Sequence, residues 1–342
     1  MSPHCRMRCI PASSDRVREL GRIFAACLLC LAVQVSIAAE PTPPSIAFEH
    51  EPDGLAITVD GKPFANFVYA DEKITRPYFA HVRAPNGVQV TRTHPPVAGS
   101  DPTDHPEFHP GIWMSFGDVS GADSWRLKSP VRFERFVEEP HGGAGEGGFA
   151  ARFVHADPKD ANAVICHEDL RCDVRATPEG TLLSWDSTFT GDREFAFGDQ
   201  EEMGLGVRMA TPLRAEQVSK QGLPAGGGEI VSADGKRNEA EVWGTAPTWC
   251  DYRGEVDGKS AGVAILSHPE NFRPSWFHVR DYGLMVANPF GRAAFDHGEP
   301  SRVTVAPGEA LRLRYGVLVH GAAAGENVDL DRAFERYVEI AK

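Results

Sequence analysis

The sequence is poor in cysteine, which excludes one class of small exported protein. Four of its seven cysteines fall within the first 30 residues, so only Cys166, Cys172 and Cys250 serve the rest of the chain. Three thiols form at most one disulfide, and a scaffold held together by disulfides is therefore excluded. Cys166 and Cys172 are close enough in sequence to be bridged across a hairpin or turn, and three buried thiols are the alternative.

Basic residues are also scarce, with 35 Lys and Arg against 48 Asp and Glu. Removal of the five basic and two acidic residues of positions 1–39 leaves 30 basic and 46 acidic residues, a net charge of −16. Such an excess of negative charge disfavours binding to nucleic acid and to anionic membranes. We therefore expect a small-molecule or oligosaccharide ligand, no nucleic acid, and no membrane contact once the N-terminal segment has been removed.

Long hydrophobic runs are absent apart from the 17 residues IFAACLLCLAVQVSIAA at positions 23–39. This run follows five arginines and ends in small residues, the order that is typical of a secretory signal. It is short for a membrane anchor, the alternative, and three prolines follow it closely. We predict a signal peptide over residues 1–39, a linker over residues 40–46 and one domain over residues 47–342, in a protein exported to the periplasm or the extracellular space.

Helical periodicity is confined to the C-terminal segment LDRAFERYVEIAK, which Asp329 is placed to cap. Elsewhere apolar residues alternate with period two between turn residues, as in LAITVDGKPFANFVYA, where Asp60-Gly61 predicts a hairpin turn. Pro307-Gly308 predicts the turn of the last hairpin. Many strands without alternating helices predict an all-β fold, a large antiparallel β-supersandwich with a short C-terminal helix.

One stretch, DHPEFHPGIWMSFGDVSGADSW at residues 104–125, combines histidines, prolines, carboxylates and tryptophans. Pro106 and Pro110 forbid a regular helix, so His105 and His109 should lie on a loop, where functional side chains often gather. The spacing matches no HExxH motif. Three interpretations stay open: a metal site with His105 and His109 as ligands, a metal-free polar site, and a surface loop whose polar side chains only cap the backbone.

A second stretch, DQEEMGLGVRM at residues 199–209, reads as a strand with glycines at every other position. Alternation would place Glu202, Gly204, Gly206 and Arg208 on one face. A carboxylate and a guanidinium on an open glycine face leave room for a ligand. The alternative is a solvated face with a weak Glu–Arg pair.

A third stretch, SHPENFRPSWFHVRDYGLMVANPFG at residues 267–291, is rich in aromatic and basic residues. Alternation places Trp276, His278, Arg280 and Tyr282 on one face, and Asn288 follows in the next strand. Such a face suits a sugar, because its C–H surfaces stack on aromatic rings while its hydroxyls take hydrogen bonds. The alternative is a structural histidine and arginine beneath a loop.

Three segments, RPYFAHVRAPNGVQVTR, DHPEFHPGIWMSFGDVSGADSW and FHVRDYGLMVANPFG, together resemble a bacterial family labelled PmoA-like, a domain of unknown function. The resemblance covers most of residues 70–320. Many members read DHPHH in the second motif, where this sequence has Glu107 and Phe108.

The family label implies a subunit of methane mono-oxygenase, an enzyme whose subunit spans the membrane with many helices. This chain has no spanning segment after its signal, so we expect the label to be a misnomer for function. The strand pattern of the family is similar to the galactose-mutarotase-like supersandwich, a fold common among carbohydrate enzymes. The resemblance therefore implies the same all-β fold as the alternation, but a fold alone does not imply a function.

The combined prediction is an exported carbohydrate-active protein with a site on a concave sheet face. The predicted chemistry is acid/base catalysis on a sugar, of the epimerase, lyase or hydrolase type, with a His or Glu as base and another His as acid. One alternative is a non-catalytic sugar-binding protein, and another is a metal-dependent enzyme such as an oxygenase. The sequence requires no cofactor, and a divalent metal enters only through the His105–His109 alternative.

The predicted catalytic residues are His105, His109, Glu202 and His278. The predicted substrate-binding residues are Arg208, Trp276, Arg280, Tyr282 and Asn288.

Overall fold

The computed structural model describes residues 42–160, 163–216, 222–323 and 325–342. Contacts divide the chain into two units, residues 1–42 and residues 43–342, and the second unit contains the fold described below. The predicted signal peptide at residues 1–39 lies outside the described residues. The predicted linker at residues 40–46 lies partly outside them, and its last two residues, Ser45 and Ile46, already belong to the first strand.

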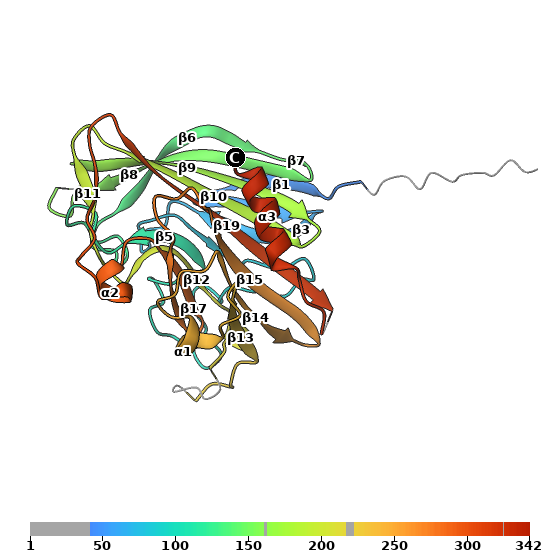
Figure 1. The fold of residues 1–342 in the computed structure, drawn as a ribbon. Helices are drawn as coiled ribbons and strands as arrows, with labels where there is room; N and C mark the ends of the chain where they lie inside the picture. The colour runs from blue at the N-terminus through green and yellow to red at the C-terminus, as the bar shows by residue number, and fades with distance from the viewer. Residues whose placement is uncertain (1–41, 161–162, 217–221, 324) are drawn as a thin grey trace, which may run out of the picture. The chain divides into compact units, whose positions relative to one another are not determined.

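Two large antiparallel sheets form most of the unit (Figure 1). Among the described residues, the first sheet has nine strands in the spatial order β16 (Trp276–Arg280), β17 (Leu284–Asn288), β12 (Met203–Arg208), β5 (Ile112–Phe116), β4 (Tyr78–Ala80), β3 (Lys62–Val68), β2 (Gly54–Val59), β1 (Ser45–Glu51) and β7 (Gly143–Ala144). The second has eight in the order β13 (Gly228–Ser232), β14 (Trp249–Val256), β15 (Lys259–Ser267), β19 (Ala310–Ala323), β10 (Gly180–Thr190), β9 (Val164–Thr177), β8 (Glu146–Ala156) and β6 (Val131–His141).

Smaller elements complete the unit. A two-stranded sheet pairs β11 (Phe195–Phe197) with β18 (Val303–Val305). The helices are α1 (Asn238–Val242), α2 (Arg292–Asp296), α3 (Leu330–Ile340) and the 3-10 turn η1 (Thr211–Leu213). In the described part of the chain, no helix is long and apolar enough to cross a membrane.

The main core lies between the two large sheets. Phe79 of β4 contacts Trp185 of β10, with ring centroids 5.8 Å apart, and Phe67 of β3 contacts Phe149 of β8 at 4.7 Å. All four side chains are buried because alternate residues of each strand point inward. The predicted large antiparallel all-β architecture is confirmed.

The C-terminal helix α3 covers the outer face of the second sheet (Figure 1). The Asp329 side chain accepts a hydrogen bond from the Arg332 backbone N–H at 3.0 Å, the predicted N-cap. Leu330 and Tyr337 are buried against Leu318 of β19. The predicted C-terminal helix and its cap are confirmed.

The two predicted turns have different outcomes. Asp60 and Gly61 have φ angles of 53° and 70°, as a tight hairpin turn requires, and they join β2 to β3. Gly308 also turns the chain, with φ 83°, but β18 pairs with β11 while β19 pairs with β10 and β15. The predicted last hairpin is therefore wrong, because this turn passes the chain from one sheet to another.

The three cysteines of the described residues are free and buried. Cys166 and Cys172 lie on the same strand, β9, six residues apart, which is about 20 Å at the rise of a strand. A disulfide spans less than about 7 Å between Cα atoms, so these two residues are not bridged. Burial raises the pKa of both thiols and of the Cys250 thiol.

Candidate functional site on the outer face of the nine-stranded sheet

The face of the nine-stranded sheet that points away from the main core carries most of the predicted site residues. Strand pairing arranges them in two rows across β5, β12, β17 and β16. The first row contains Trp113, Gly206, Val286 and His278, and the second contains Arg208, Leu284 and Arg280. Three strand spacings separate Trp113 from His278, about 14 Å, so the face has two ends joined by a floor of small and apolar residues.

The first end is built around His109, on the loop at residues 101–111. His109 is 3% exposed and its ring stacks on Trp113, with centroids 5.1 Å apart. Gly206 makes this possible, because a Cβ there would lie 2.7 Å from the Trp113 ring. His105 is exposed, and its ring lies 5.2 Å from that of His109. The prediction that both histidines lie on a loop is confirmed.

Arg76 fixes the path of this loop from below. Its side chain is 1% exposed and donates hydrogen bonds to three backbone carbonyls, those of Phe108 at 2.6 Å, Ser124 at 3.0 Å and Trp125 at 3.2 Å. Burial lowers the Arg76 pKa to about 9. One guanidinium therefore ties the histidine loop to the segment that follows β5.

Two further buried arginines, Arg92 and Arg208, hold the other side of the loop. Arg92 donates to the backbone carbonyls of Asp104, at 3.0 Å, and Pro102. Arg208 donates to the Asp104 carboxylate at 2.9 Å and, at 3.4 Å, to Nδ1 of His109. No local pattern predicts that Arg92 is buried, because arginine is normally a surface residue.

His109 is an uncharged member of this cluster. Burial, followed by the charge of Arg208, lowers its pKa well below the ordinary value. Because Nδ1 faces the Arg208 guanidinium, a metal ion at that nitrogen would meet a second cation. Within the described ranges, no three His, Cys, Asp or Glu side chains form a group that could hold a metal. The residues around His105 and His109 therefore do not fit the metal site that was one of the three interpretations of this loop.

Tyr282 lies between the two ends of the face. The Arg208 guanidinium carbon lies 4.5 Å from the centre of its ring, a cation–π contact. The charges of Asp104, Arg280 and Glu202 also act on it. Burial raises the Tyr282 pKa, so the phenol keeps its proton at neutral pH.

The second end of the face is built around His278, on the edge strand β16. His278 is 4% exposed, and its hydrogen bonding is incomplete: the Glu201 backbone acts on the ring, but neither ring nitrogen has a partner of regular hydrogen-bond geometry among the described residues. Its Nε2 lies 3.3 Å from Oε1 of Glu201, close enough for charge interaction but outside hydrogen-bond geometry. Arg280 donates to the same Oε1 at 2.8 Å and to Glu239 at 3.2 Å.

The environment of His278 keeps its ring neutral. Burial lowers the His278 pKa to about 4; Arg280 adds to this shift and Glu201 opposes it. Glu201 and Arg280 are themselves partly exposed, at 38% and 26% of their side chains. A buried neutral imidazole thus lies directly beneath groups that solvent reaches.

Glu202 was predicted to share a face with Gly206 and Arg208, and its charge acts on Tyr282 of that face. It pairs with Arg126 at the surface, and its neighbour Glu201 is the carboxylate beside His278. Both glutamates precede β12, which begins at Met203, so alternation within the strand does not fix their directions. Glu201 and Glu239 were not predicted as site residues. Glu239 is 41 residues from its partner Arg280, so no local sequence pattern connects the two.

Asn288 is a structural residue in this fold. It is fully buried, and its Nδ2 donates to the backbone carbonyls of Gln200 at 2.8 Å and Glu201 at 3.0 Å. Its Oδ1 accepts from the backbone N–H groups of Phe290 and Gly291. Asn288 therefore does not serve as the predicted substrate contact, because its amide holds the segment that carries Glu201.

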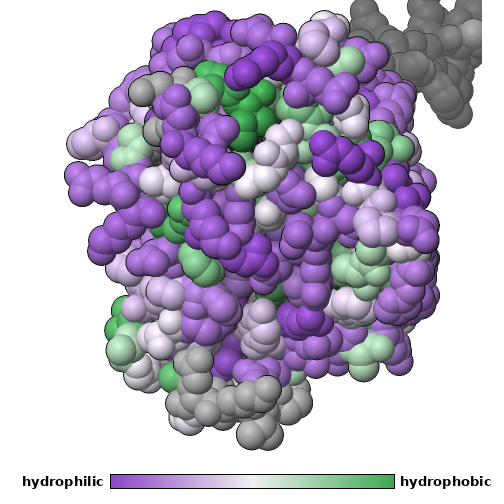
Figure 2. Space-filling model, turned by 90° about the vertical axis from the view of Figure 1, so that its left-hand side faces the viewer, coloured by the Kyte–Doolittle hydropathy of each residue, from purple (hydrophilic) through white to green (hydrophobic). Residues whose placement is uncertain are grey.

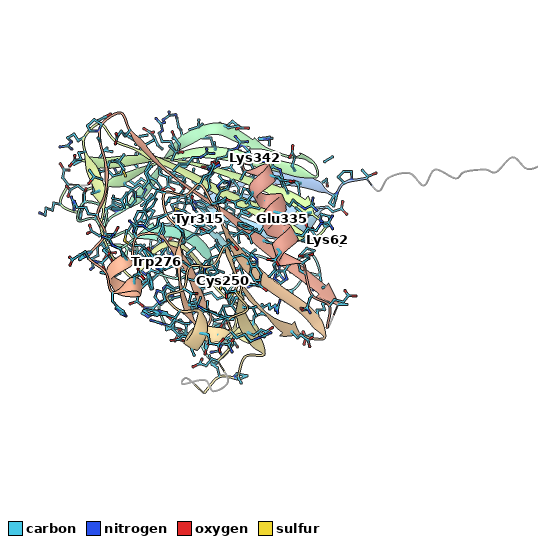
Figure 3. All side chains as sticks on the ribbon, viewed as in Figure 1. Lys62, Cys250, Trp276, Tyr315, Glu335 and Lys342 are labelled. Atoms are coloured by element: carbon cyan, nitrogen blue, oxygen red, sulfur yellow. The ribbon has the colours of Figure 1, made fainter. Side chains whose placement is uncertain are left out.

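Trp276 lies at the outer end of β16, beside α2 (Figure 3). It is half-buried and stacks on Phe295 of α2, with ring centroids 6.2 Å apart. Figure 2 shows the side of the molecule that faces left in Figure 1, where α2 lies; its surface is mainly hydrophilic, with hydrophobic residues in small separate patches. Trp276, His278 and Arg280 share one face of β16, as predicted.

The chain belongs to a family of unknown function, DUF6807, whose family model matches residues 54–335. The description of that family carries no oxygenase label, so the resemblance to PmoA-like proteins stays a prediction. No curated protein matches the chain.

Solved structures that resemble this chain include three sugar-epimerase-like proteins. A galactose mutarotase-like protein from Clostridium acetobutylicum is 9% identical, over 82% of this chain and 99% of that one, with a TM-score of 0.40. A GalM/aldose epimerase homologue from C. elegans is 9% identical, over 82% and 100%, with a TM-score of 0.35. A putative aldose 1-epimerase from Escherichia coli K12 is 13% identical, over 80% and 98%, with a TM-score of 0.32. At these scores the likeness says nothing about substrate or activity.

Proposed function

We propose that the protein binds a sugar on the outer face of the nine-stranded sheet and catalyses a proton transfer on it. The observation that carries this proposal is His278, a buried, neutral imidazole with incomplete hydrogen bonding beside the Glu201 carboxylate. Folded proteins rarely leave buried polar atoms unpaired. A titratable group with a shifted pKa and a charged partner is also a frequent mark of a catalytic site.

In the proposed reaction, His278 accepts a proton from the sugar as the general base. Glu201 stabilises the imidazolium that forms, because its carboxylate lies 3.3 Å from Nε2. Arg280 and the protonated Tyr282 are placed to stabilise negative charge that develops on a sugar oxygen. In an elimination His278 gives this proton to the leaving oxygen; in an epimerisation the deprotonated intermediate must turn over in the site before His278 returns the proton to the other face of the carbon.

This arrangement favours epimerisation or elimination over hydrolysis. Glycoside hydrolysis generally uses a carboxylic acid as proton donor. The carboxylates on this face are engaged with arginines: Glu201 and Glu239 with Arg280, and Glu202 with Arg126. We therefore assign the proton transfer to the His278–Glu201 pair.

The chemistry of the surrounding side chains supports a sugar as the substrate. Arg280 and Glu201 present a partly exposed fork of donors and acceptors, which suits vicinal hydroxyl groups. Tyr282 supplies aromatic surface for the C–H face of a sugar ring. The ion pairs on this face combine positive with negative charge, which suits a neutral polyhydroxylated ligand.

Replacement of the proposed base tests the function. In a screen of the wild-type protein against a panel of glycans, we expect turnover of at least one, and His278→Asn should lower its kcat/KM by about 10²- to 10⁴-fold. His141→Asn is the matched control, because His141 is exposed on β6. Binding of glycans without turnover by the wild type would instead identify a non-catalytic sugar-binding protein, and an unchanged rate for His278→Asn would refute the assignment of the base.

We also infer that the protein is exported, from the basic, apolar and small residues of positions 1–39. Expression of the full chain in a bacterial host, followed by N-terminal sequencing of the periplasmic protein, should find a mature chain that starts near residue 39 or 40. Retention of Met1 in a membrane fraction would show an uncleaved anchor instead.

A further inference from the structure

Aromatic rings extend the site beyond His278, toward the start of β16. Phe295 of α2 is at the centre of this group, with Trp243 at 5.2 Å, Trp276 at 6.2 Å and His278 at 6.3 Å between ring centroids. Phe272 lies further along the chain segment that leads into β16. We call Trp243, Phe295, Trp276 and Phe272 the aromatic strip.

Arg273 joins the outer two rings of the aromatic strip. Its guanidinium carbon lies 5.4 Å from the centre of the Phe272 ring and 5.6 Å from that of Trp276. Hydrogen bonds to the Pro289 carbonyl at 3.2 Å and to the Ser301 hydroxyl at 3.1 Å hold the guanidinium in this position. The outer end of the strip is therefore a fixed arrangement of two rings and a cation.

Two features of the aromatic strip point to a ligand. Phe272 is 38% exposed, one of three large hydrophobic side chains at the surface of the described residues. The indole Nε1 of Trp243 is a buried donor without a partner in the described part of the chain, although the Trp243 side chain as a whole is only half-buried. An exposed ring and an unused donor beside a polar site are typical of surfaces that bind amphipathic molecules.

The aromatic strip is continuous with the proposed catalytic site. Arg280 donates to Glu201 and also lies over the Trp243 ring, with 5.7 Å from guanidinium carbon to ring centre. Along β16, Arg280 and Trp276 are four residues apart, about 13 Å at the rise of a strand. This distance is longer than one pyranose ring, so a sugar at His278 and Arg280 leaves Trp276 free for another unit.

We propose that the substrate is an oligosaccharide or polysaccharide, and that Trp276 with Arg273 binds the sugar unit next to the one that reacts. This inference rests on the proposed function and specifies the substrate of that same site. The reacting unit contacts His278 and Arg280, and the neighbouring unit stacks on Trp276. Arg273 binds the hydroxyls at the edge of that unit while Phe272 extends the surface.

Binding of sugars of increasing length tests the proposal. Cello-, xylo- and malto-oligosaccharides of one to six units would be titrated into the mature protein by calorimetry. We expect one series to bind about tenfold more tightly at two or three units than at one. Trp276→Ala should abolish this gain without a change for the single unit, and Trp276→Phe, which keeps a ring, should restore part of it. Trp249→Phe, on the other sheet, is the control.

The outcomes separate this inference from the proposed function. If a monosaccharide is turned over in a His278-dependent manner and longer sugars bind no better, the oligosaccharide inference is wrong and the function stands. Equal weakening of all lengths by Trp276→Ala would also overturn the inference, because it would assign Trp276 to the reacting unit. If the protein neither binds nor turns over a sugar of any length, the oligosaccharide inference and the proposed function are both wrong.

Discussion

The two ends of the outer sheet face are built from the same residue types and differ in what their arginines contact. Around His109, Arg76 and Arg92 donate to backbone carbonyls, while Arg208 donates to the Asp104 carboxylate and to His109. Around His278, Arg280 donates, within the part of the chain that the structure describes, to side-chain carboxylates, those of Glu201 and Glu239. Both histidines are buried and uncharged at neutral pH.

This difference separates architecture from chemistry. A guanidinium bound to several backbone carbonyls cannot change partners without breaking the loop that it holds. A guanidinium bound to partly exposed carboxylates can exchange them for the hydroxyls of a ligand at small cost, because exposed ion pairs contribute little to stability. We therefore assign the His109 end to support and the His278 end to catalysis, although both contain residues that the sequence marked as catalytic.

Of the changes that test this comparison, replacement of Arg76 should have the largest effect on the free energy of unfolding. Arg76→Met keeps much of the side-chain volume but leaves the carbonyls of Phe108 and Trp125 without a donor, each at a cost of about 1–3 kcal/mol, whereas the Ser124 carbonyl keeps the Leu127 backbone N–H. We expect the free energy of unfolding to fall by about 3 kcal/mol or more in urea denaturation. Arg135→Met, at an exposed arginine of β6, should change it by less than about 0.5 kcal/mol. A small effect of Arg76→Met would mean that the loop has another support.

Acidification should lower the free energy of unfolding through the histidines of both ends, and we expect this effect to be smaller. The folded pKa is lowered for His109 and His278, so the unfolded chain binds more protons below its ordinary histidine pKa of about 6.5. Their contribution to stability is complete above about pH 6.5 and is lost as the pH falls below it, for His278 toward its folded pKa of about 4, at up to about 1.4 kcal/mol per pH unit for each histidine.

Variants at the two ends should both change the pH dependence of stability, and their stabilities at neutral pH should differ. His109→Asn and His278→Asn should each flatten the fall in stability between about pH 6.5 and 4, measured by urea denaturation at several pH values. At pH 7, His109→Asn should be the less stable of the two, because it loses the stacking on Trp113 and the acceptor of Arg208. Equal stability of the two variants at pH 7 would remove the distinction between the ends.

Period-two alternation was enough to predict the strands, the all-β class and the shared face of Trp276, His278 and Arg280. It works because successive side chains of a strand point to opposite faces. It could not assign Glu201 and Glu202, since both precede the strand and a shift of one residue reverses the direction of a side chain. It also could not show that Pro307-Gly308 leads from one sheet to another, because sheet partners are set by distant segments.

Buried arginines were the least predictable part of the site. Nothing in the local sequence distinguishes Arg76 or Arg92 from a surface arginine, because their acceptors are carbonyls of loops that become neighbours only on folding. Asn288 illustrates the same limit in reverse. Its amide is of a type that binds sugars, but the turn after β17 and the segment before β12 use all of its hydrogen bonds.

The buried cysteines described above provide the fold with internal probes of opening. Cys166 and Cys172 lie within β9, in the interior of the second sheet, while Cys250 lies in β14, one strand from the opposite edge. A thiol reagent reaches each position only when its strand separates from its neighbours, so the rate of labelling measures how often that part of the sheet opens. The opening of the two halves of the eight-stranded sheet can thus be timed independently in a protein that needs no added label site.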